Sequence, residues 1–352
     1  MKFGVINFLK AGAAQLIVLH HLAFYGPMSD HVRLMLPELV DWLAGSARIA
    51  VQVFLVVGGF LAAKSLAPQA QPGIADPLGA IWRRYLKLAP PFIAATLLAA
   101  AATALASSWM THDSISDPAT LGQLAAHALL LQSVLGYPAL SAGAWYVAID
   151  FQLYALVVMM LWLSRRRAWM LPLLVATGCA LSLLHFNLDP DWDNWAPYFF
   201  GSYALGMAAW WASDPHRKTS AALLMLAACM LALVALVVDF RSRLALALVV
   251  ACVLVLFGRM RTAGEGRGWA TIDWLAQISY AVFLIHFPVS LLVNAAFTRF
   301  VPPEPELQGL GMLTAWAASL AAGAAFHRWI EVPLGRYFSA PRSAIAGRAA
   351  TA

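Results

Sequence analysis

Four ionisable side chains stand inside long apolar stretches of the chain: His20 and His21, which are adjacent, Asp150 and His286. Ionisable groups at membrane depth are costly and usually face the protein interior or a water-filled cavity, so they are candidate functional residues. Histidine exchanges its proton near neutral pH. A carboxylate on one imidazole nitrogen orients the ring and stabilises the imidazolium that forms when the other nitrogen takes a proton. The pattern indicates buried proton chemistry, with His21 as base and Asp150 as its orienting partner.

The alternative is that these residues are hydrogen-bonded structural groups inside a helix bundle. That interpretation is stronger for His286 than for Asp150, because a buried carboxylate requires a partner.

A second group of residues, Arg83, Arg84 and Lys87, precedes the prolines Pro90 and Pro91. Arg84 and Lys87 are three positions apart and share one face of a helix. Guanidinium and ammonium groups suit phosphates, so the spacing predicts a site for a cytosolic donor that carries phosphates. The alternative is that these charges only anchor the start of a membrane span at its cytoplasmic face.

The composition explains which elements must position these residues. Of the 352 residues, 62% are hydrophobic and 11% are charged, whereas soluble domains carry about 25% charged residues. We predict an all-α polytopic membrane protein. The three cysteines lie in apolar runs, so no disulfide framework is expected. A net charge of +6 raises the possibility of nucleic-acid binding, but the positive charges stand in short loops, where membrane topology explains them better.

About ten segments are long and apolar enough to cross a bilayer. The predicted spans are 8–25, 47–64, 87–107, 144–163, 168–185, 196–212, 220–238, 243–258, 273–297 and 310–330. The apolar segment 121–136 is too short and is predicted as an interfacial or re-entrant helix. A single transmembrane domain then covers residues 1–340, and a short cytoplasmic tail covers 341–352. The first segment lacks a small-residue cleavage site and is interpreted as a retained span.

Charge decides the predicted orientation. With the N-terminus inside, 18 of the 23 Lys and Arg residues fall on the inner side, which by the positive-inside rule places both termini in the cytoplasm. The outer side keeps only five: Arg33, Arg48, Arg241, Arg243 and Arg299.

Depth along the predicted spans brings three ionisable positions to one level. At about 1.5 Å per helical residue, His21, Asp150 and His286 all lie about 20 Å from the inner face. The agreement favours a shared site in the outer half of the membrane.

Six segments, in this order, resemble the integral membrane acyltransferase-3 family over nearly the whole chain. They are Lys10 to His21 (KAGAAQLIVLHH), Val51 to Leu61 (VQVFLVVGGFL), Arg84 to Pro90 (RYLKLAP), Trp145 to Tyr154 (WYVAIDFQLY), Ile278 to Pro288 (ISYAVFLIHFP) and Ile330 to Pro333 (IEVP). The family pattern has a basic residue and then a histidine eleven positions later, which selects His21 over His20.

The chain departs from the family pattern at four positions. Gln52 and Gly58 replace the usual Asp and Ser, Lys87 stands where Arg is usual, and Asp150 stands where Glu is usual. Lysine lacks the bidentate grip of arginine, and the shorter Asp150 needs closer helices to reach His21.

The resemblance implies an O-acyltransferase, with acetyl the first choice of acyl group and succinyl the second, acting in a bacterial inner membrane. Acyl-CoA is the donor substrate, the acceptor is a cell-envelope glycan or lipid-linked sugar, and no metal or tightly bound cofactor is expected. His21 and Asp150 are the expected catalytic residues. Arg83, Arg84 and Lys87 are expected to bind acyl-CoA. Acceptor-binding or supporting roles fall to Trp145, Gln152, Tyr154, His286, Glu331 and His20.

Two other functions stay open at this stage. A proton-coupled transporter would use His21, Asp150 and His286 as a relay, but no internal repeat of the kind that many transporters carry is visible. A non-catalytic scaffold would not require titratable groups aligned at one depth. The aromatic residues of the outer loops suit sugar rings and suit an interfacial aromatic belt equally well.

Overall fold

The computed structural model describes residues 4–216, 219–260 and 267–339, and in these ranges it contains helices and no strand. The predicted tail 341–352 and four of the positive charges predicted to be cytoplasmic (Lys2, Arg217, Lys218 and Arg261) lie outside the described residues. The α-helices are α1 (Gly4–Phe24), α2 (Pro27–Arg33), α3 (Pro37–Gly45), α4 (Val51–Leu66), α5 (Pro77–Ala106), α6 (Leu121–Ala128), α7 (Ala144–Leu163), α8 (Met170–Leu184), α9 (Ala196–Ala212), α10 (Thr219–Val238), α11 (Ser242–Phe257), α12 (Arg267–Phe300), α13 (Pro305–Phe326) and α14 (Val332–Ser339). The all-α prediction is confirmed.

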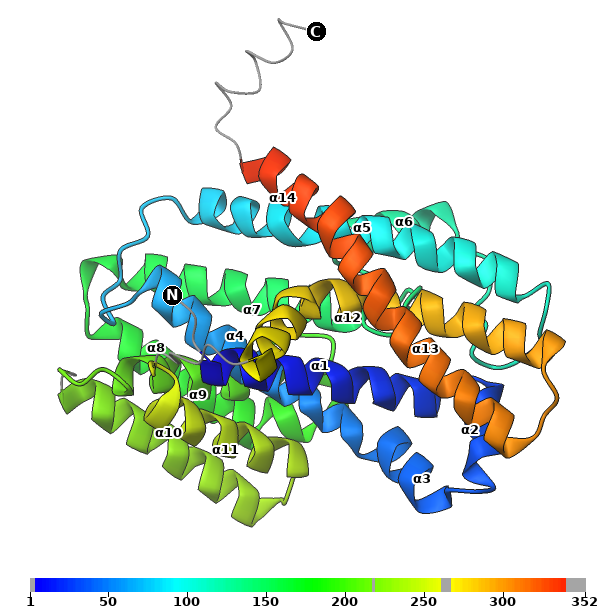
Figure 1. Cartoon of the computed structure of the whole chain (residues 1–352). Helices are drawn as coiled ribbons and strands as arrows, with labels where there is room; N and C mark the ends of the chain where they lie inside the picture. The colour runs from blue at the N-terminus through cyan, green and yellow to red at the C-terminus, as the bar shows by residue number, and fades with distance from the viewer. Residues whose placement is uncertain (1–3, 217–218, 261–266, 340–352) are drawn as a thin grey trace, which may run out of the picture.

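The long helices run side by side along one axis (Figure 1). We call the end of the bundle where α1 begins the near end, and the end where α1 meets α2 and α3 the far end. The near end is the side that the charge distribution predicts as cytoplasmic. In the described part of the chain, eight helices are long and apolar enough to cross a membrane, which fits a multi-pass membrane protein.

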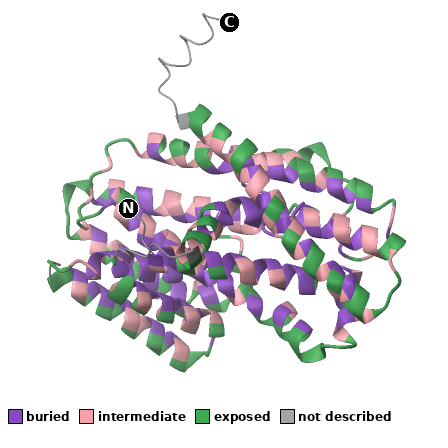
Figure 2. Ribbon diagram, viewed as in Figure 1, coloured by how far each residue is buried: buried purple, intermediate pink, exposed green. Residues whose placement is uncertain are grey.

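Two of the ten predicted spans, 196–212 and 243–258, correspond to the shorter helices α9 and α11, of 17 and 16 residues. Helix α9 is packed between α4, α8, α10 and α11, and almost all of its residues are buried. This central position explains why its sequence mixes Gly, Tyr and Trp with the apolar residues. The outward faces of α10 and α11 expose large apolar side chains, as lipid contact requires (Figure 2).

Helix α5 begins ten residues before the predicted third span. Asp76 caps it by accepting a hydrogen bond from the Gly79 N–H at 2.8 Å, and Pro77 occupies its first position. Arg83 and Arg84, which precede the predicted span, therefore lie on the same helix as Lys87. In the segment 121–136 only α6 is helical, and turns follow it.

Small residues allow α4 and α9 to cross closely. A Cβ atom on Gly59 would lie 1.9 Å from the Tyr203 carbonyl oxygen, and one on Gly206 would lie 1.9 Å from the Val56 carbonyl oxygen. Only glycine at these positions permits such an approach of two backbones. The remaining packing that positions the site is that of α1 on α12, and of α7 on α5 and α9.

Candidate active site

His21 of α1 meets His286 of α12. The Nδ1 atom of His21 lies 2.6 Å from Nε2 of His286, and the two rings are nearly parallel, with an angle of 8° and 4.8 Å between their centres. The two nitrogen atoms are thus much closer than the ring centres, as expected for a hydrogen bond along the line that joins the rings. The extensive packing of α1 on α12 brings these two residues together although 265 positions separate them.

The hydrogen bonds determine which nitrogen of each neutral ring carries the proton. Nδ1 of His286 lies 3.1 Å from the Val282 carbonyl oxygen, and a carbonyl only accepts, so this nitrogen donates. Nε2 of His286 is then an acceptor, and His21 must donate to it from Nδ1. His21 keeps its lone pair on Nε2, for which the described part of the chain offers no hydrogen-bond partner. A general base needs such a free lone pair.

His20 has a different partner. Its Nδ1 lies 2.8 Å from the Leu43 carbonyl oxygen of α3, so it donates to that carbonyl and ties α1 to the far-end helices. His20 and His21 are about 100° apart around α1, which explains why one contacts α3 and the other α12.

His21 lines a far-end cavity of about 600 Å³, which we call the His21 cavity. Its other lining residues are His20, Phe24, Tyr25, Ala44, Gly45, Arg48, Asp113, Ser114, Ser116, Ala139, Ser141, Ala142, Trp145 and Phe287. His286 is 1% exposed and is absent from this lining, so His21 is the member of the pair that can touch a ligand. The volume suits a sugar-sized molecule.

The expected pairing of His21 with Asp150 is not what the structure contains. The Asp150 carboxylate forms an ion pair with the Arg84 guanidinium, and His21 bonds to His286. The reason is helix packing: α7, which carries Asp150, packs on α5, which carries Arg84, whereas α1 packs on α12. The equal depth predicted for Asp150 and His21 did not indicate which helices are neighbours.

Asp150 and Arg84 line a second cavity of about 330 Å³, the Arg84 cavity. Three cations (Lys10, Arg84 and Lys87) and two carboxylates (Asp150 and Glu331) contribute to its lining. The remaining lining residues are Phe54, Val57, Gly58, Leu61, Leu88, Tyr146, Val147, Gln277, Ser279, Tyr280, Phe283 and Gly335. The Nε atom of Arg84 is buried, and no described residue accepts a hydrogen bond from it. A buried donor without a partner costs about 1–3 kcal/mol, so an acceptor atom of a ligand would be stabilised here.

Aromatic side chains stand between the Arg84 cavity and the histidine pair. Phe283 lines that cavity, and its ring centre lies 6.1 Å from that of His286. Its ring also lies 5.4 Å from Tyr146 and 6.4 Å from Phe54. We call Phe54, Tyr146 and Phe283 the aromatic cluster. A molecule that passed from the Arg84 cavity to His21 would have to displace or slide past this cluster.

One face of α1 contributes to both cavities. Lys10 lines the Arg84 cavity, and His21 lines the His21 cavity. Eleven residues are close to three full helical turns, so these two side chains lie on nearly the same face, about 16 Å apart along the axis. The cationic cluster and the histidine are therefore aligned along the bundle axis.

Some of the other predicted site residues line a cavity, and others lie outside both cavities. Trp145 lines the His21 cavity, and Glu331 lines the Arg84 cavity while its carboxylate lies 2.8 Å from His327 Nδ1. Tyr154 packs its ring 5.1 Å from the Arg84 guanidinium. Gln152 has a structural position, since its side-chain amide bonds Asn194 and Ala196 at the start of α9.

Arg83 is exposed and lines neither cavity, unlike Arg84 next to it.

Two residues of the site were not singled out from the sequence. Phe283 precedes His286 by three positions, a spacing that places both on one helix face. Arg48 was visible only as one of the few outer arginines. Tyr25 lies beside His21, with 5.6 Å between the ring centres, and lines the same cavity as Arg48.

Comparisons with known proteins agree with this architecture. A family model described as an acyltransferase domain, that of acyltransferase-3, matches residues 3–326. Neither a search of curated proteins nor a search of solved structures found a match.

Proposed function

Because the chain belongs to the acyltransferase-3 family and is a membrane acyltransferase, we propose that it moves an acyl group, acetyl in the first instance, from cytoplasmic acyl-CoA to a hydroxyl group of an extracytoplasmic glycan or lipid-linked sugar. The near end faces the cytoplasm of a bacterial inner membrane in this proposal. The observation that supports it most is the pair of cavities that approach the His21–His286 pair from opposite ends of the bundle.

The donor enters at the near end in this proposal. Lys10, Arg84 and Lys87 supply the positive charge that the phosphates of acyl-CoA require. The ion pair with Asp150 holds the Arg84 guanidinium in place, and its free Nε–H offers a further hydrogen bond to the donor. The flexible pantetheine arm then carries the thioester past the aromatic cluster to His21.

The acceptor enters at the far end and meets the thioester at His21. Nε2 of His21 removes the proton from the acceptor hydroxyl as its oxygen attacks the thioester carbonyl carbon. The tetrahedral intermediate collapses with cleavage of the C–S bond, and the departing CoA sulfur takes the proton from the imidazolium. His286 keeps the Nδ1 proton of His21 in place throughout, so that Nε2 is always the atom that exchanges protons.

The same contacts favour acyl transfer over a proton relay through Asp150. A relay from His21 to Asp150 needs a hydrogen-bonded connection between them, and the described residues pair each with a different partner.

Substitution of His21 tests the proposal. We expect His21→Ala to lower acyl transfer by about 10²- to 10⁴-fold, the usual contribution of a general base. The measurement is release of CoA and mass-spectrometric detection of acylated envelope glycan, with the protein in nanodiscs supplied with acetyl-CoA.

His20→Ala is the matched control, since His20 is the adjacent buried histidine and donates only to the Leu43 carbonyl. It should reduce activity far less than His21→Ala. Undiminished transfer by a folded His21→Ala protein would refute the assignment of the base.

A further inference from the structure

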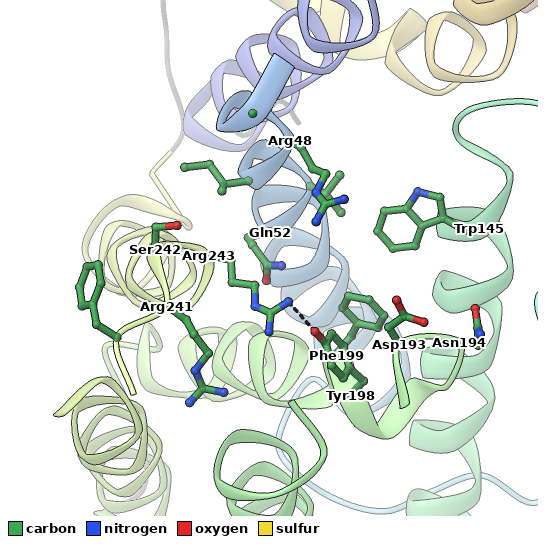
Figure 3. A pocket seen from close by; sticks show the side chains of 14 residues that line it. Arg48, Gln52, Trp145, Asp193, Asn194, Tyr198, Phe199, Arg241, Ser242 and Arg243 are labelled. Carbon is green, nitrogen blue, oxygen red and sulfur yellow. Dashed lines mark hydrogen bonds between the residues drawn. The ribbon is translucent and has the colours of Figure 1, made fainter. Parts of the chain in front are cut away.

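Five arginines lie on the side of the chain that the positive-inside rule predicts as extracytoplasmic, and the structure gathers three of them around one cavity. The cavity has a volume of about 540 Å³, and we call it the Arg48 cavity. Arg48, Arg241 and Arg243 line it together with Gln52 and Trp145, as Figure 3 shows. These arginines come from the segment before α4 and from the start of α11, so more than 190 positions separate them in sequence.

The two other outer arginines are positioned differently. Arg33 pairs with Asp41 at 2.9 Å, and Arg299 is exposed and lines neither the Arg48 cavity nor the His21 cavity. The gathering of the remaining three is therefore a property of this cavity and not of the whole far end.

The lining carries more positive than negative charge. Arg241 is neutralised in part by Asp239, whose Oδ2 lies 3.5 Å from its Nε. Arg243 donates to the Tyr198 hydroxyl and to the Asn187 carbonyl oxygen, which are both uncharged. Two of its five donors are used, and the others remain for a ligand.

The Arg48 side chain has neither a hydrogen bond nor an ion pair within the described ranges. Against these guanidinium groups, Asp193 is the one carboxylate of the described lining. Gln52 adds no charge, although the family pattern has Asp at this position, and its Oε1 accepts a hydrogen bond from the Ser202 hydroxyl at 2.7 Å. The cavity thus has the charge that an anion requires.

The Arg48 cavity adjoins the His21 cavity. Gly45, Arg48 and Trp145 line both. Trp145 is half-buried and held against Phe199, with 5.6 Å between the ring centres. A ligand on the Trp145 ring can therefore place one group beside Arg48 and another beside His21.

We infer that the acceptor carries an anionic group, a carboxylate or a phosphate, which Arg48 and Arg243 bind while a sugar ring lies against Trp145 and a hydroxyl group points to His21. This inference rests on the proposed function and adds the chemical class of the acceptor to it. Guanidinium groups bind both carboxylates and phosphates in bidentate geometry. A uronic acid of a glycan would supply the first, and the phosphate of a lipid-linked sugar would supply the second.

Binding without acyl-CoA tests the inference independently of turnover. The probes are glucuronic acid, glucose 1-phosphate and glucose, titrated by saturation-transfer NMR against the protein in phosphatidylcholine nanodiscs at low salt. We expect at least one anionic sugar to bind at least about tenfold more tightly than glucose, because its charged group can form ion pairs with the arginines and glucose has no such group. Preference for glucuronic acid would assign a carboxylate, and preference for glucose 1-phosphate would assign a phosphate.

Three variants, at Arg48 and Gln52, test whether the anion binds in the Arg48 cavity. Arg48→Gln should lower the affinity for the preferred anion about 10- to 100-fold and leave that for glucose nearly unchanged, whereas Arg48→Lys should retain part of the preference. Gln52→Asp should weaken the same anion by adding a negative charge to the lining. Arg299→Gln is the matched control and should bind all three sugars as the wild type does.

Equal binding of the three sugars, absence of binding, or an anion preference that Arg48→Gln and Gln52→Asp both leave intact would each overturn the inference. The two proposals can fail separately. If His21→Ala abolishes acyl transfer but Arg48→Gln changes no affinity, only the anionic subsite is wrong. If anion binding depends on Arg48 but His21→Ala transfers acyl groups normally, only the catalytic proposal is wrong.

Discussion

The two ends of the bundle differ in how far the arginine side chains that line their cavities are paired with carboxylates. At the near end, the Arg84 cavity is lined by helices, and its central guanidinium is bound to the Asp150 carboxylate. At the far end, the His21 and Arg48 cavities are lined largely by loops and short helices, and the Arg48 side chain has no partner among the described residues. The Arg84–Asp150 pair belongs to the packed part of the protein, whereas the Arg48 side chain is free to respond to a ligand.

Under the proposed function, this difference predicts how the two substrates are recognised. Acyl-CoA would present the same phosphates whatever the acceptor is, so a fixed site built into helices would be adequate for it. Acceptors differ in chemistry, and residues on loops can change without disturbing the helices that they join. In this proposal the donor site is the more rigid of the two, and the acceptor site is the one that can change more easily.

The largest effect is expected from breaking the near-end ion pair. Arg84→Ala leaves the Asp150 carboxylate buried without its partner, and such a change costs about 3–5 kcal/mol in the free energy of unfolding. Because the Arg84 side chain is 23% exposed, the lower end of this range applies. Thermal unfolding in detergent, followed by tryptophan fluorescence, would measure the loss.

The double variant Arg84→Met with Asp150→Asn distinguishes stability from donor binding. Removing both charges should restore much of the stability while the KM for acyl-CoA stays raised. If Arg84→Ala is as stable as the wild type, the near-end charges are not part of the core, and the contrast between the two ends fails.

The sequence predicted the helices better than the contacts between them, for a physical reason. Spans, helical class and the cationic spacing of Arg84 and Lys87 follow from local hydropathy and helical periodicity. The partner of each side chain does not follow from these local patterns. The position of a residue along a helix predicts its depth, but the rotation of the helix and the identity of the neighbouring helix depend on packing. His21 therefore has His286 as its partner instead of Asp150, which pairs with Arg84.

The Arg48 cavity shows the same limit more strongly. Arg48 and Arg243 are far apart in the sequence and lie next to short helices and turns, where no periodic pattern indicates which residues meet. Their one visible signal was negative: they were exceptions to the positive-inside rule. Exceptions of this kind identify candidate residues but not the cavity that they share.

A smaller effect, on kcat, is expected from substitution of His286, which lies between the Arg84 cavity and the His21 cavity. His286→Ala removes the acceptor that holds the Nδ1 proton of His21. We expect kcat to fall about 10- to 100-fold, less than in His21→Ala because the base itself remains. The KM for acyl-CoA should change little, since His286 lines neither cavity.

His286→Gln provides the control, because the amide oxygen of glutamine can accept the same hydrogen bond. It should recover a substantial part of kcat relative to His286→Ala. Equal activity of the two variants would show that His286 fills space and does not orient the base.

The smallest effect concerns a far-end loop that His127 of α6 holds. Its Nδ1 lies 2.8 Å from the Gln123 carbonyl oxygen, to which it donates, and its Nε2 accepts a hydrogen bond from the Leu140 N–H at 3.1 Å. Only a neutral ring can make both bonds. Burial lowers the pKa of His127 below its ordinary value, so the unfolded chain takes up a proton at a higher pH than the folded protein does.

The sign of the pH dependence follows from that shift. The contribution of His127 to stability is complete above the ordinary histidine pKa of about 6.5 and is lost as pH falls from there through the lowered pKa of the folded state. Protonation would break the Leu140 bond and loosen the segment that brings Ser141 to the His21 cavity. The protection factors of residues 129–143, which correct for the slower intrinsic exchange at low pH, should therefore fall between pH 7.5 and 5.5 in the wild type and much less in His127→Gln. The same loss of protection in both proteins would mean that another group controls the loop. The distinction between a fixed near end and an adaptable far end would then have to rest on the arginines alone.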